Sequence, residues 1–489
     1  MCSLAVLVAL LALSTCALGS GWVGECRISG NFGSQPCIAR DSSGRMWAVW
    51  SADKGDTTLM YSQWLQSEGR WSPERGVGPD GPGVYCRLRP ALAFDGNGRG
   101  CLVWHNVYDS GNTRGIASSF WVDTCWIPEV QVALPDSIND LNFAPTVACG
   151  GGEVWCVWYG GSSSTLRYSV YASHWSESAG HWEPKMQVSP PDGTTHWWCD
   201  VAVDGQGVPH VVWCNSERGL ICYSRYDDSS WTAPVSVNDT LLVGAPGWAD
   251  PRIVIDNAGL MHVCYTGVAT GATGRDIFYA RNDGNGWTPS VRVTQDTLTN
   301  YNEWYSDLDA DGPDNVWVAW DRQHEGSDYF RIHASHYDGS AWSAEVRLDG
   351  DSAYYDDYPD VCLDAAGNPW VVWTGITYGT NEEYAYFSRY VTEAVTDVVP
   401  SPARRRLVES AASVSKGTVD VVFSLPLAGR ARLEVFDAMG RRTAVILDES
   451  VSAGRHRVQW QTRIPAGIYV CRLEALGEGE TWKIMLVSH

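Results

Sequence analysis

The sequence predicts an all-β fold: a seven-bladed β-propeller with four-stranded blades, followed by a small C-terminal β-sandwich. Three observations lead to this fold class. A turn residue and an aromatic residue recur together at a near-constant period, each period holds four short alternating segments, and the N-terminal segment matches a strand that the last period lacks. Repeats of this length, built of short strands and turns, are typical of radially arranged β-sheets.

The period is set by an aromatic residue, usually Trp, that follows a turn residue by nine positions. Successive aromatics lie 54, 54, 55, 52, 55 and 53 residues apart. We call these seven residues the repeat aromatics, and their constant distance from a turn predicts that they form blade core. The pairs are Asp41/Trp50, Asp95/Trp104, Asp204/Trp213, Asp256/Tyr265, Asp311/Trp320 and Asp364/Trp373, with Cys149/Trp158 as a degenerate copy.

One copy shows all four strands. Apolar residues alternate over 251–255 and 261–265, on either side of a DxxG turn at Asp256, which predicts a β-hairpin. A third strand is expected over 276–282, and a fourth begins at Trp287. The same place in other copies is taken by Trp71, Trp126, Trp182, Trp231 and Trp342.

The seventh copy has no fourth strand, because residues after Tyr390 neither alternate nor contain Trp. Residues 21–28 (GWVGECRI) resemble residues 341–348 (AWSAEVRL), the fourth strand of the sixth copy. We therefore expect the N-terminal strand to complete the last blade and close the ring, which removes exposed sheet edges.

The expected organisation is a signal peptide over 1–20, the propeller over 21–395, a linker over 396–415 and an Ig-like β-sandwich over 416–489. Residues 1–20 are apolar and end in small residues, as in exported proteins, and a lipobox-like context at Cys16 leaves lipidation open. No later apolar run is long enough for a transmembrane span after signal cleavage.

Composition restricts the partners. With 35 basic and 57 acidic residues the net charge is -22, so nucleic acid and anionic membranes would be repelled. Of 15 cysteines, 13 follow the leader; an odd number cannot all pair in one chain. Cys101, Cys156, Cys214, Cys264 and Cys362 replace small apolar residues of sister repeats, so we interpret them as buried hydrophobes. We expect a monomer.

The C-terminal residues carry a specific resemblance. Residues 436–441 (FDAMGR), 453–456 (AGRH), Trp460, 465–469 (PAGIY) and 483–486 (KIML) resemble the C-terminal sorting domain of type IX secretion cargo. They are also similar to the Ig-like domain of the flagellar hook-capping protein family. The first resemblance implies export through a bacterial outer membrane by a secretion machinery that binds this domain, and localisation as a secreted or cell-surface protein.

The DxxGxxWVVW repeats resemble the BNR and sialidase-like propeller superfamily over residues 21–395. The sialidase Asp box has one residue between Asp and Gly, whereas this chain has two. The resemblance implies that a sialidase would need an arginine triad, a Tyr/Glu nucleophile pair and an acid Asp. Arg87, Arg89 and Arg252 precede or enter inner strands, but no RIP motif precedes the first repeat.

Loops that enter the innermost strands converge on one face of a propeller, and here they combine aromatic and acidic residues. Aromatic faces stack on sugar CH groups while carboxylates accept sugar hydroxyls, so these residues predict a glycan site; packing in the central channel is the structural alternative. The predicted ligand-binding residues are His196, Trp197, Trp198, Asp200, Trp248, Arg252, Tyr301, Trp304, Asp307, Tyr355, Asp357, Tyr358 and Asp360. Asp250 and Tyr305 lie in the same loops.

Catalytic candidates lie in the sixth copy. Asp321, His324 and Glu325 follow its repeat aromatic and could meet Glu303 or Asp357 across the channel, where paired carboxylates would allow glycosidase chemistry. A hydrated loop has the same composition, and a His with a nearby Tyr would suit a polysaccharide lyase.

No cofactor is required by these patterns, but calcium is a candidate. Asp307, Asp309 and Asp311 match the opening of a DxDxDG loop. Val318 occupies the twelfth position, so the closing acid of an EF-hand is missing.

The function expected from the sequence is binding of a glycan or a cell-surface protein through the loop face. A carbohydrate-active enzyme, either a sialidase-like hydrolase or a polysaccharide lyase, is the alternative, and a structural surface protein is a third hypothesis. Paired carboxylates or a His and Tyr pair in a pocket would favour the enzyme; exposed rings without such a pair would favour binding.

Overall fold

The computed structural model divides the chain into two compact units, Met1–Pro400 and Ser401–His489. The residues it describes are 21–30, 32–52, 58–78, 84–108, 113–135, 140–162, 164–165, 167–238, 249–269, 274–295, 301–324, 329–350, 353–377, 382–392, 408–411, 414–415, 418–425, 429–437, 441–452, 454–461, 467–475 and 478–486. The expected signal peptide with Cys16, and the candidates Trp248 and Glu325, lie outside the described residues.

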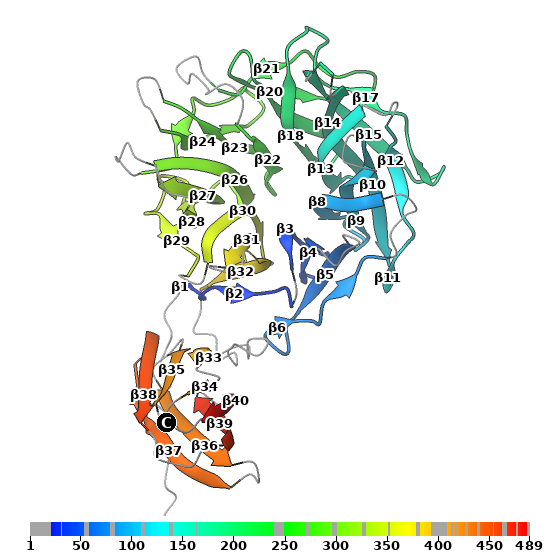
Figure 1. The fold of residues 1–489 in the computed structure, drawn as a ribbon. Coiled ribbons are helices and arrows are strands. Elements are labelled where there is room, and N and C mark those ends of the chain that lie inside the picture. Colours follow the sequence, from blue (N-terminus) through cyan, green and yellow to red (C-terminus); the bar gives the residue numbers. More distant parts are fainter. Residues whose placement is uncertain are drawn as a thin grey trace, which may run out of the picture. The chain divides into compact units, whose positions relative to one another are not determined.

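Among the described residues, the first unit contains seven antiparallel sheets of four or five strands, in chain order around a common centre (Figure 1). The first three sheets are β3 (Ser34–Arg40), β4 (Met46–Ala52), β5 (Thr58–Leu65), β6 (Arg70–Trp71) and β7 (Arg75–Gly76); β8 (Val84–Phe94), β9 (Gly100–Tyr108), β10 (Thr113–Val122), β11 (Cys125–Trp126) and β12 (Val130–Ala133); and β13 (Asp140–Gly150), β14 (Glu153–Ser162), β15 (Arg167–Ser176), β16 (His181–Trp182) and β17 (Met186–Gln187).

The next three sheets have four strands each. They are β18 (His196–Val203), β19 (Pro209–Asn215), β20 (Leu220–Arg225) and β21 (Val235–Ser236); β22 (Arg252–Ile255), β23 (Met261–Gly267), β24 (Asp276–Asn282) and β25 (Val291–Arg292); and β26 (Tyr301–Gly312), β27 (Asn315–His324), β28 (Phe330–Tyr337) and β29 (Val346–Arg347). The last sheet joins β30 (Ala353–Leu363), β31 (Pro369–Thr377) and β32 (Glu383–Val391) to β1 (Gly21–Trp22) and β2 (Cys26–Arg27).

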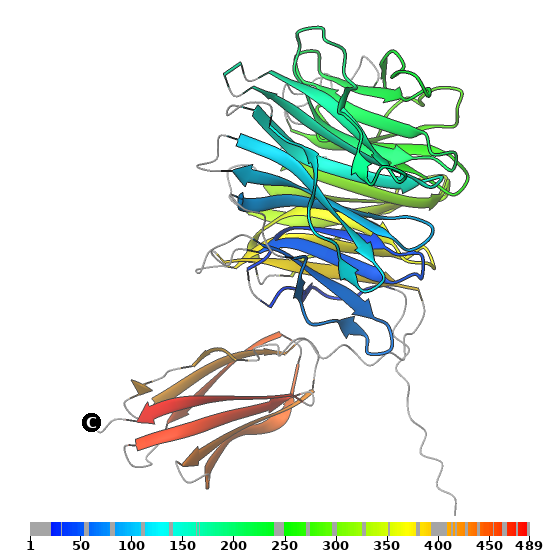
Figure 2. The same ribbon diagram turned by 90° about the vertical axis from the view of Figure 1, so that its right-hand side faces the viewer.

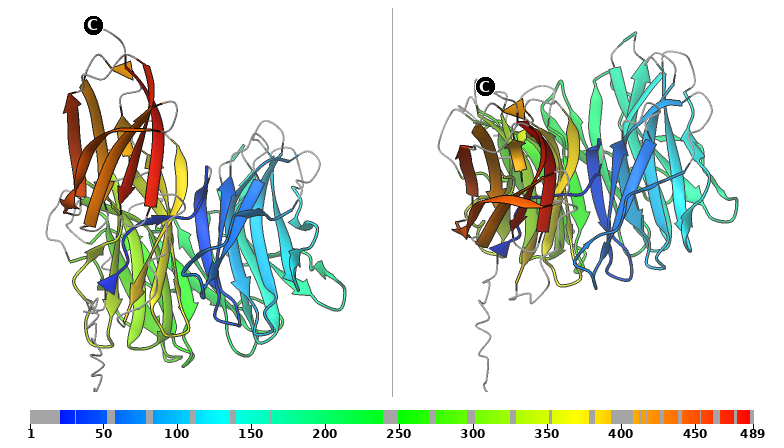
Figure 3. Two further views of the ribbon diagram at one scale, coloured as in Figure 1. Left: turned by 90° about the horizontal axis from the view of Figure 1, so that it is seen from below. Right: turned by 60° about the horizontal axis from the view of Figure 1, so that its bottom comes forward.

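The innermost strands contact one another in cyclic order, from β3 through β8, β13, β18, β22, β26 and β30 back to β3. Figure 2 and Figure 3 show the same sheets from further directions. Four-stranded antiparallel sheets in this arrangement have the architecture of a β-propeller.

The N-terminal strand joins the last sheet, as the sequence predicted. Gly21 pairs with Val391 and Trp22 with Tyr390, and β2 continues the pairing through Cys26 and Phe387. The ring of Trp22 also packs against Trp317 of the preceding sheet, with centroids 5.6 Å apart. Sheet hydrogen bonds and aromatic packing therefore connect the first and last described strands of this unit.

The repeat aromatics form the core of the sheets, since each is at most 2% exposed. In five copies the turn Asp caps the DxxG turn as expected: one oxygen of Asp256, for example, accepts the backbone N–H groups of Ala258 and Leu260. Asp311 is different. Gly312 pairs directly with Asn315, so the turn there is a two-residue hairpin, and Asp311 lies at an irregularity before it. The expectation that Asp311 caps the turn is therefore wrong.

The second unit contains two sheets in the described residues. One is β33 (Val408–Ala411), β35 (Thr418–Leu425) and β38 (Gly454–Gln461); the other is β34 (Val414–Ser415), β40 (Glu478–Leu486), β39 (Gly467–Ala475), β36 (Gly429–Asp437) and β37 (Arg442–Val451). Phe423 of the first sheet and Leu433 and Cys471 of the second share one buried core.

Two strands of this unit, β33 and β34, fall inside the expected linker. β33 pairs with β35, and β34 pairs in parallel with β40. β33 and β34 therefore cover the backbone N–H and C=O groups of β35 and β40, which would be unpaired at the sheet edges if residues 408–415 were only a linker. Among the described residues, no helix is long and apolar enough to cross a membrane.

Closure of the ring can be tested at Trp22. We expect Trp22→Ala to lower the free energy of unfolding of the first unit by about 2–3 kcal/mol, because a partly buried aromatic leaves both its sheet partner and Trp317. Urea unfolding of the full chain measures the effect. Trp22→Phe should lose less, and the exposed Val122→Ala should change stability by no more than about 0.5 kcal/mol. An unchanged midpoint for Trp22→Ala would show that β1 does not stabilise the ring.

Candidate functional site

The innermost strands are irregular near their starts. The register shifts in β3, β8, β13, β18, β26 and β30, and five residues at these shifts have positive φ: Gln35 (50°), Arg89 (51°), Ala144 (41°), Trp198 (45°) and Tyr358 (52°). Four of the five precede a Pro, which has no N–H to continue the ladder. A β-bulge of this kind redirects one side chain, and positive φ in residues other than Gly often accompanies function.

These five residues line one pocket together with Asp250 and Tyr305 of the two remaining sheets. The seven side chains, here called the pocket ring, come one from each sheet, and their spacings in the sequence follow those of the repeat aromatics. Six of them lie fifteen residues before the repeat aromatic of their copy, and Ala144 lies fourteen before it. The cavity measures about 80 Å³.

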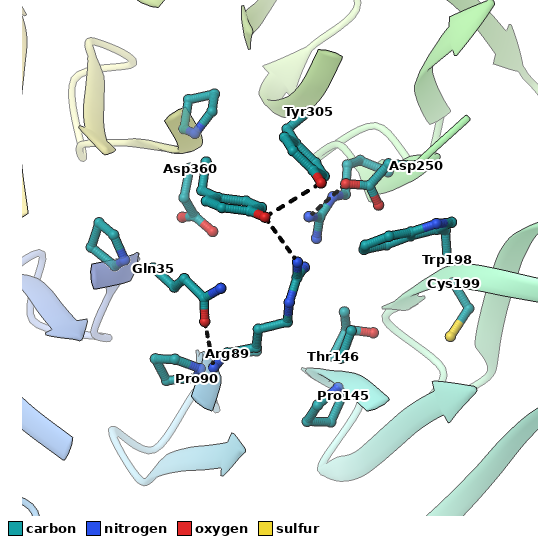
Figure 4. A pocket seen from close by; sticks show the side chains of 16 residues that line it. Gln35, Arg89, Pro90, Pro145, Thr146, Trp198, Cys199, Asp250, Tyr305 and Asp360 are labelled. Atoms are coloured by element: carbon teal, nitrogen blue, oxygen red, sulfur yellow. Dashed lines mark hydrogen bonds and ion pairs between the residues drawn. The ribbon is translucent and has the colours of Figure 1, made fainter. Parts of the chain in front are cut away.

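Arg89 lies at the centre of the pocket ring (Figure 4). Its guanidinium is 5.0 Å from the ring centroid of Trp198 and 4.9 Å from that of Tyr358. Nη2 donates to the Tyr358 hydroxyl at 3.2 Å, and that hydroxyl donates to Tyr305 at 3.3 Å. Among the described residues, no carboxylate lies within ion-pair distance of Arg89, so aromatic faces and one hydroxyl are its partners.

A second layer of side chains lies two residues further along each inner strand. It contains Asp200, Arg252, Asp307 and Asp360. Arg252 forms ion pairs with Asp250 at 3.4 Å and with Asp307 at 4.0 Å. One cation is thus surrounded by several carboxylates inside the ring.

The carboxylates of this layer accept backbone N–H groups from the next sheet. Asp200 accepts Ile253 at 2.9 Å, Asp307 accepts Val361 at 2.8 Å, and Asp360 accepts Ile38 at 3.0 Å. Asp309, two residues after Asp307 in β26, accepts the backbone N–H of Leu363 at 2.7 Å. These aspartates connect neighbouring sheets, which explains their place on the inner strands without a ligand.

Burial of these carboxylates changes their protonation. Desolvation raises the pKa of Asp360 to about 7 and that of Asp309 to about 6, although the backbone donors oppose the shift. Desolvation and the neighbouring Asp360 raise the pKa of Asp307 well above its usual range. Arg252 is affected oppositely, because the surrounding carboxylates raise its pKa in spite of burial.

The predicted ligand-binding residues separate into two groups. Trp198, Arg252, Tyr358 and Asp360 line the pocket, and Asp200 and Asp307 lie beside it in the second layer. The others have partners elsewhere, as follows: His196 is buried and bonded to Trp213 and Asp192, Trp197 stacks on Tyr168, Tyr301 lies against Arg322, Trp304 against Arg275, and Tyr355 against Phe330.

The catalytic candidates do not line the pocket. Glu303 is 1% exposed and accepts Arg322 Nε at 2.7 Å, and Arg322 also pairs with Glu345. Asp321 is fully buried; desolvation, with the nearby Asp357 and Glu303 charges, raises its pKa well above the usual range. Asp321 lies in the interior, near enough to Asp357 for the two charges to interact, and it does not line the pocket.

Asp357 itself is 7% exposed. Desolvation raises the pKa of its carboxyl, and Arg89 opposes this shift. His324 ends β27, where its backbone pairs with that of Tyr301. Two carboxylates that were not catalytic candidates line this pocket. Asp250 is ion-paired with Arg252, and Asp360 accepts the backbone N–H of Ile38.

The calcium candidates have protein partners. Asp307 and Asp309 accept backbone N–H groups of β30, and Asp311 accepts the side-chain amide of Asn315 at 2.8 Å. Within the described residues, no three His, Cys, Asp or Glu side chains form a group able to hold a metal ion. Calcium binding by these residues stays a prediction that the observed contacts do not favour.

The sequence patterns did not single out Gln35 or Ala144, nor did they predict Arg89, Asp250 or Tyr305 as ligand-binding residues. The signal was available, because the residue before an inner-strand Pro recurs with the period of the repeat aromatics: Gln35-Pro36, Arg89-Pro90, Ala144-Pro145, Asp250-Pro251 and Tyr358-Pro359. The repeat spacing does not predict the backbone conformation that directs these side chains toward the pocket.

Comparison with known proteins adds no family. No family model and no curated protein matches the chain. Similar solved structures include a protein of unknown function from Dyadobacter fermentans (TM-score 0.48, 10% identity, 76% of this chain and 99% of that one). Others are an ulvan lyase bound to GlcA(1-4)Rha3S (0.48, 11%, 75% and 95%) and the NanB sialidase of Streptococcus pneumoniae (0.41, 12%, 74% and 70%).

These neighbours include carbohydrate-active enzymes, but all lie at TM-scores below 0.5. Resemblance at this distance assigns neither a family nor an activity to the chain. The architecture rests on the sheets themselves, and the function has to be argued from the pocket.

The strained backbone at the pocket can be tested at Ala144, where φ is 41°. Gly adopts positive φ without the Cβ clash, so Ala144→Gly should raise the free energy of unfolding by about 0.5–1 kcal/mol. Ala148→Gly, in the same strand β13, is the matched control. There the extra flexibility should lower stability by a similar amount. If both variants lose stability in urea unfolding, the bulge at Ala144 is not strained.

Asp309 predicts a specific pH dependence. Its pKa is about 6 in the folded chain and near 3.8 when unfolded, so the folded state binds more protons between these values. Its contribution to stability is therefore greatest below about pH 4 and falls as the pH rises to about 6. Asp309→Asn should flatten this part of the stability profile. Parallel urea titrations at several pH values check it, and identical slopes in both proteins would contradict it.

Proposed function

We propose that the first unit is a closed seven-bladed propeller that binds an anionic sugar residue, a uronate or a sulfated sugar, at the pocket ring. The observation that carries the proposal is the position of Arg89. Its guanidinium lies between two aromatic rings of the pocket ring, and no carboxylate among the described residues is within ion-pair distance of it. In a chain of net charge -22, such a cation is unusual.

A guanidinium offers planar paired donors that match a carboxylate or sulfate. The Tyr305 hydroxyl accepts a hydrogen bond from Tyr358 and keeps its own proton, so it extends this donor group. The face of Trp198 is suited to the CH groups of a sugar ring. The chain repels anions at long range, so local arginines are what an acidic glycan requires.

The size of the cavity defines what enters it. About 80 Å³ accommodates a few water molecules or one carboxylate or sulfate group, whereas pockets that enclose a whole small ligand measure about 300–1,000 Å³. We infer that the charged substituent enters the pocket ring and that the sugar ring stays at its mouth.

A carbohydrate-active enzyme of the lyase type is the second candidate, favoured by the hydrogen-bonded chain from Arg89 through Tyr358 to Tyr305. In uronate elimination, a cation neutralises the carboxylate, and a base, here the Asp360 carboxylate at the pocket, takes the proton from the adjacent carbon. A double bond forms as the bond from the next carbon to the glycosidic oxygen breaks, and a hydroxyl protonates that departing oxygen. Desolvation raises the pKa of Tyr358, so it would stay protonated and act as the acid. The same shift opposes a Tyr nucleophile, which a sialidase-type hydrolase would need.

We also propose, from the resemblances in the sequence, that the chain is exported and that the two sheets of the second unit form an Ig-like sandwich recognised by an outer-membrane secretion machinery. A secreted or cell-surface monomer follows from this proposal. A purely structural surface role is the competing hypothesis, and it predicts no ligand for the pocket.

Arg89→Gln tests the function. It should weaken binding of polyuronate oligosaccharides by about 10- to 100-fold, because a charge-assisted hydrogen bond contributes about that much to affinity. The affinity of Arg89→Lys should lie between those of the parent chain and Arg89→Gln. Calorimetry with the full chain measures this. Carboxyl-reduced oligosaccharides should bind poorly to every variant, and Arg45→Gln, at an exposed turn, should behave as the parent chain.

Two further results decide between the candidates. Release of unsaturated uronate products that requires Tyr358, with Tyr358→Phe inactive but still binding, would establish the lyase. If the parent chain binds neither acidic nor sulfated oligosaccharides, the proposed function is wrong.

A further inference from the structure

A second cavity lies at the opposite end of β18 from the pocket ring. The pocket ring uses Trp198 near the start of β18, and the second cavity uses the turn that follows the strand, at 206–209. Its volume is about 460 Å³, within the range of ligand-binding pockets. We call it the acidic groove, and the residues that define it here are Glu153, Trp155, Glu183, Val208, Tyr226 and Asp228.

One wall of the acidic groove is aromatic and apolar. Trp155 is 5% exposed and packs against Tyr226, with ring centroids 5.4 Å apart. Met186 and Pro209 extend this wall. The indole N–H of Trp155 is buried and has no hydrogen-bond partner among the described residues, so the groove meets the indole as an apolar surface. A ligand with an apolar stem fits this wall.

The charged groups of the acidic groove are carboxylates, since no Lys or Arg is among its lining residues. Glu153 is paired with His174. In the part of the chain that the structure describes, the carboxylates of Glu183 and Asp228 have no ion-pair partner. Carboxylates only accept hydrogen bonds, so their complement is a group that only donates, which among side chains means the Lys ammonium or the Arg guanidinium.

We propose that the acidic groove binds the Lys or Arg side chain of a protein partner. The cationic group meets Glu183 and Asp228, its aliphatic stem lies along Met186 and Pro209, and a guanidinium can stack on the aromatic wall. The net charge of -22 attracts such a segment. This site is independent of the proposed glycan function, and the two ligands can be held together because the sites lie at opposite ends of β18.

The experiment is calorimetric titration of the full chain with blocked tripeptides. The probes are acetyl-Gly-Arg-Gly-amide, acetyl-Gly-Lys-Gly-amide and acetyl-Gly-citrulline-Gly-amide, the last an uncharged match in shape for Arg. We expect the cationic peptides to bind at least about fivefold more tightly than the citrulline peptide, the scale of one partly exposed ion pair. Added salt should reduce this difference.

Variants then locate the site. The double variant Glu183→Gln/Asp228→Asn should remove the preference for Arg over citrulline, and Val208→Arg, which places a cation in the acidic groove, should block binding. Glu68→Gln/Asp283→Asn, with the same loss of charge on exposed turns of other sheets, is the matched control and should bind as the parent chain does. Thermal melts confirm that each variant is folded.

Equal binding of the Arg and citrulline peptides, no binding of any peptide, or the same loss in the control double variant would each overturn the proposal. Binding of a glucosamine oligomer in place of the peptides would also overturn it, by assigning the acidic groove to a glycan. None of these outcomes bears on binding at Arg89.

Discussion

The centre of this protein depends on how the innermost strand of each sheet satisfies the backbone groups on its open edge. Such a strand has a neighbour in its own sheet on one side only, so half of its N–H groups face away from the ladder. On four occasions an Asp of the neighbouring sheet accepts one of them, as Asp307 does for Val361. Each bond fixes the position of one sheet relative to the next.

Using carboxylates for this purpose concentrates negative charge in a narrow space. Arg252 offsets part of it through Asp250 and Asp307. Desolvation raises the pKa of Asp360 and Asp309, which favours their uncharged forms. The charges that hold the ring together thereby determine the chemistry next to the pocket. Arg89 stands apart from this network, because its partners are aromatic faces and a hydroxyl, and this separates a binding group from the structural ones.

The two cavities use different parts of the same repeat. The pocket ring is built from bulges near the starts of the inner strands, where backbone strain turns unlike side chains toward one point. The acidic groove is built where two neighbouring sheets meet near their turns, so it contains residues of those two sheets alone. A repeated fold can therefore combine a shared site, to which every repeat contributes, with a local site that one pair of repeats creates.

The sequence by itself determined the repeat, the β-hairpins, the burial of the repeat aromatics and the strand that closes the ring. These features depend on local alternation of apolar residues and on the regular spacing of the repeats. The candidate site was predicted only in part. Trp198, Arg252, Tyr358 and Asp360 were found from their aromatic or charged character. Asp360 nevertheless resembles Asp200, Asp307 and Asp309 in accepting a backbone N–H of the next sheet. Only the tertiary structure decided which of these side chains reach the pocket. The packing of successive sheets brings residues about 54 positions apart together, and the sign of φ at a bulge decides whether a side chain faces the pocket or the protein.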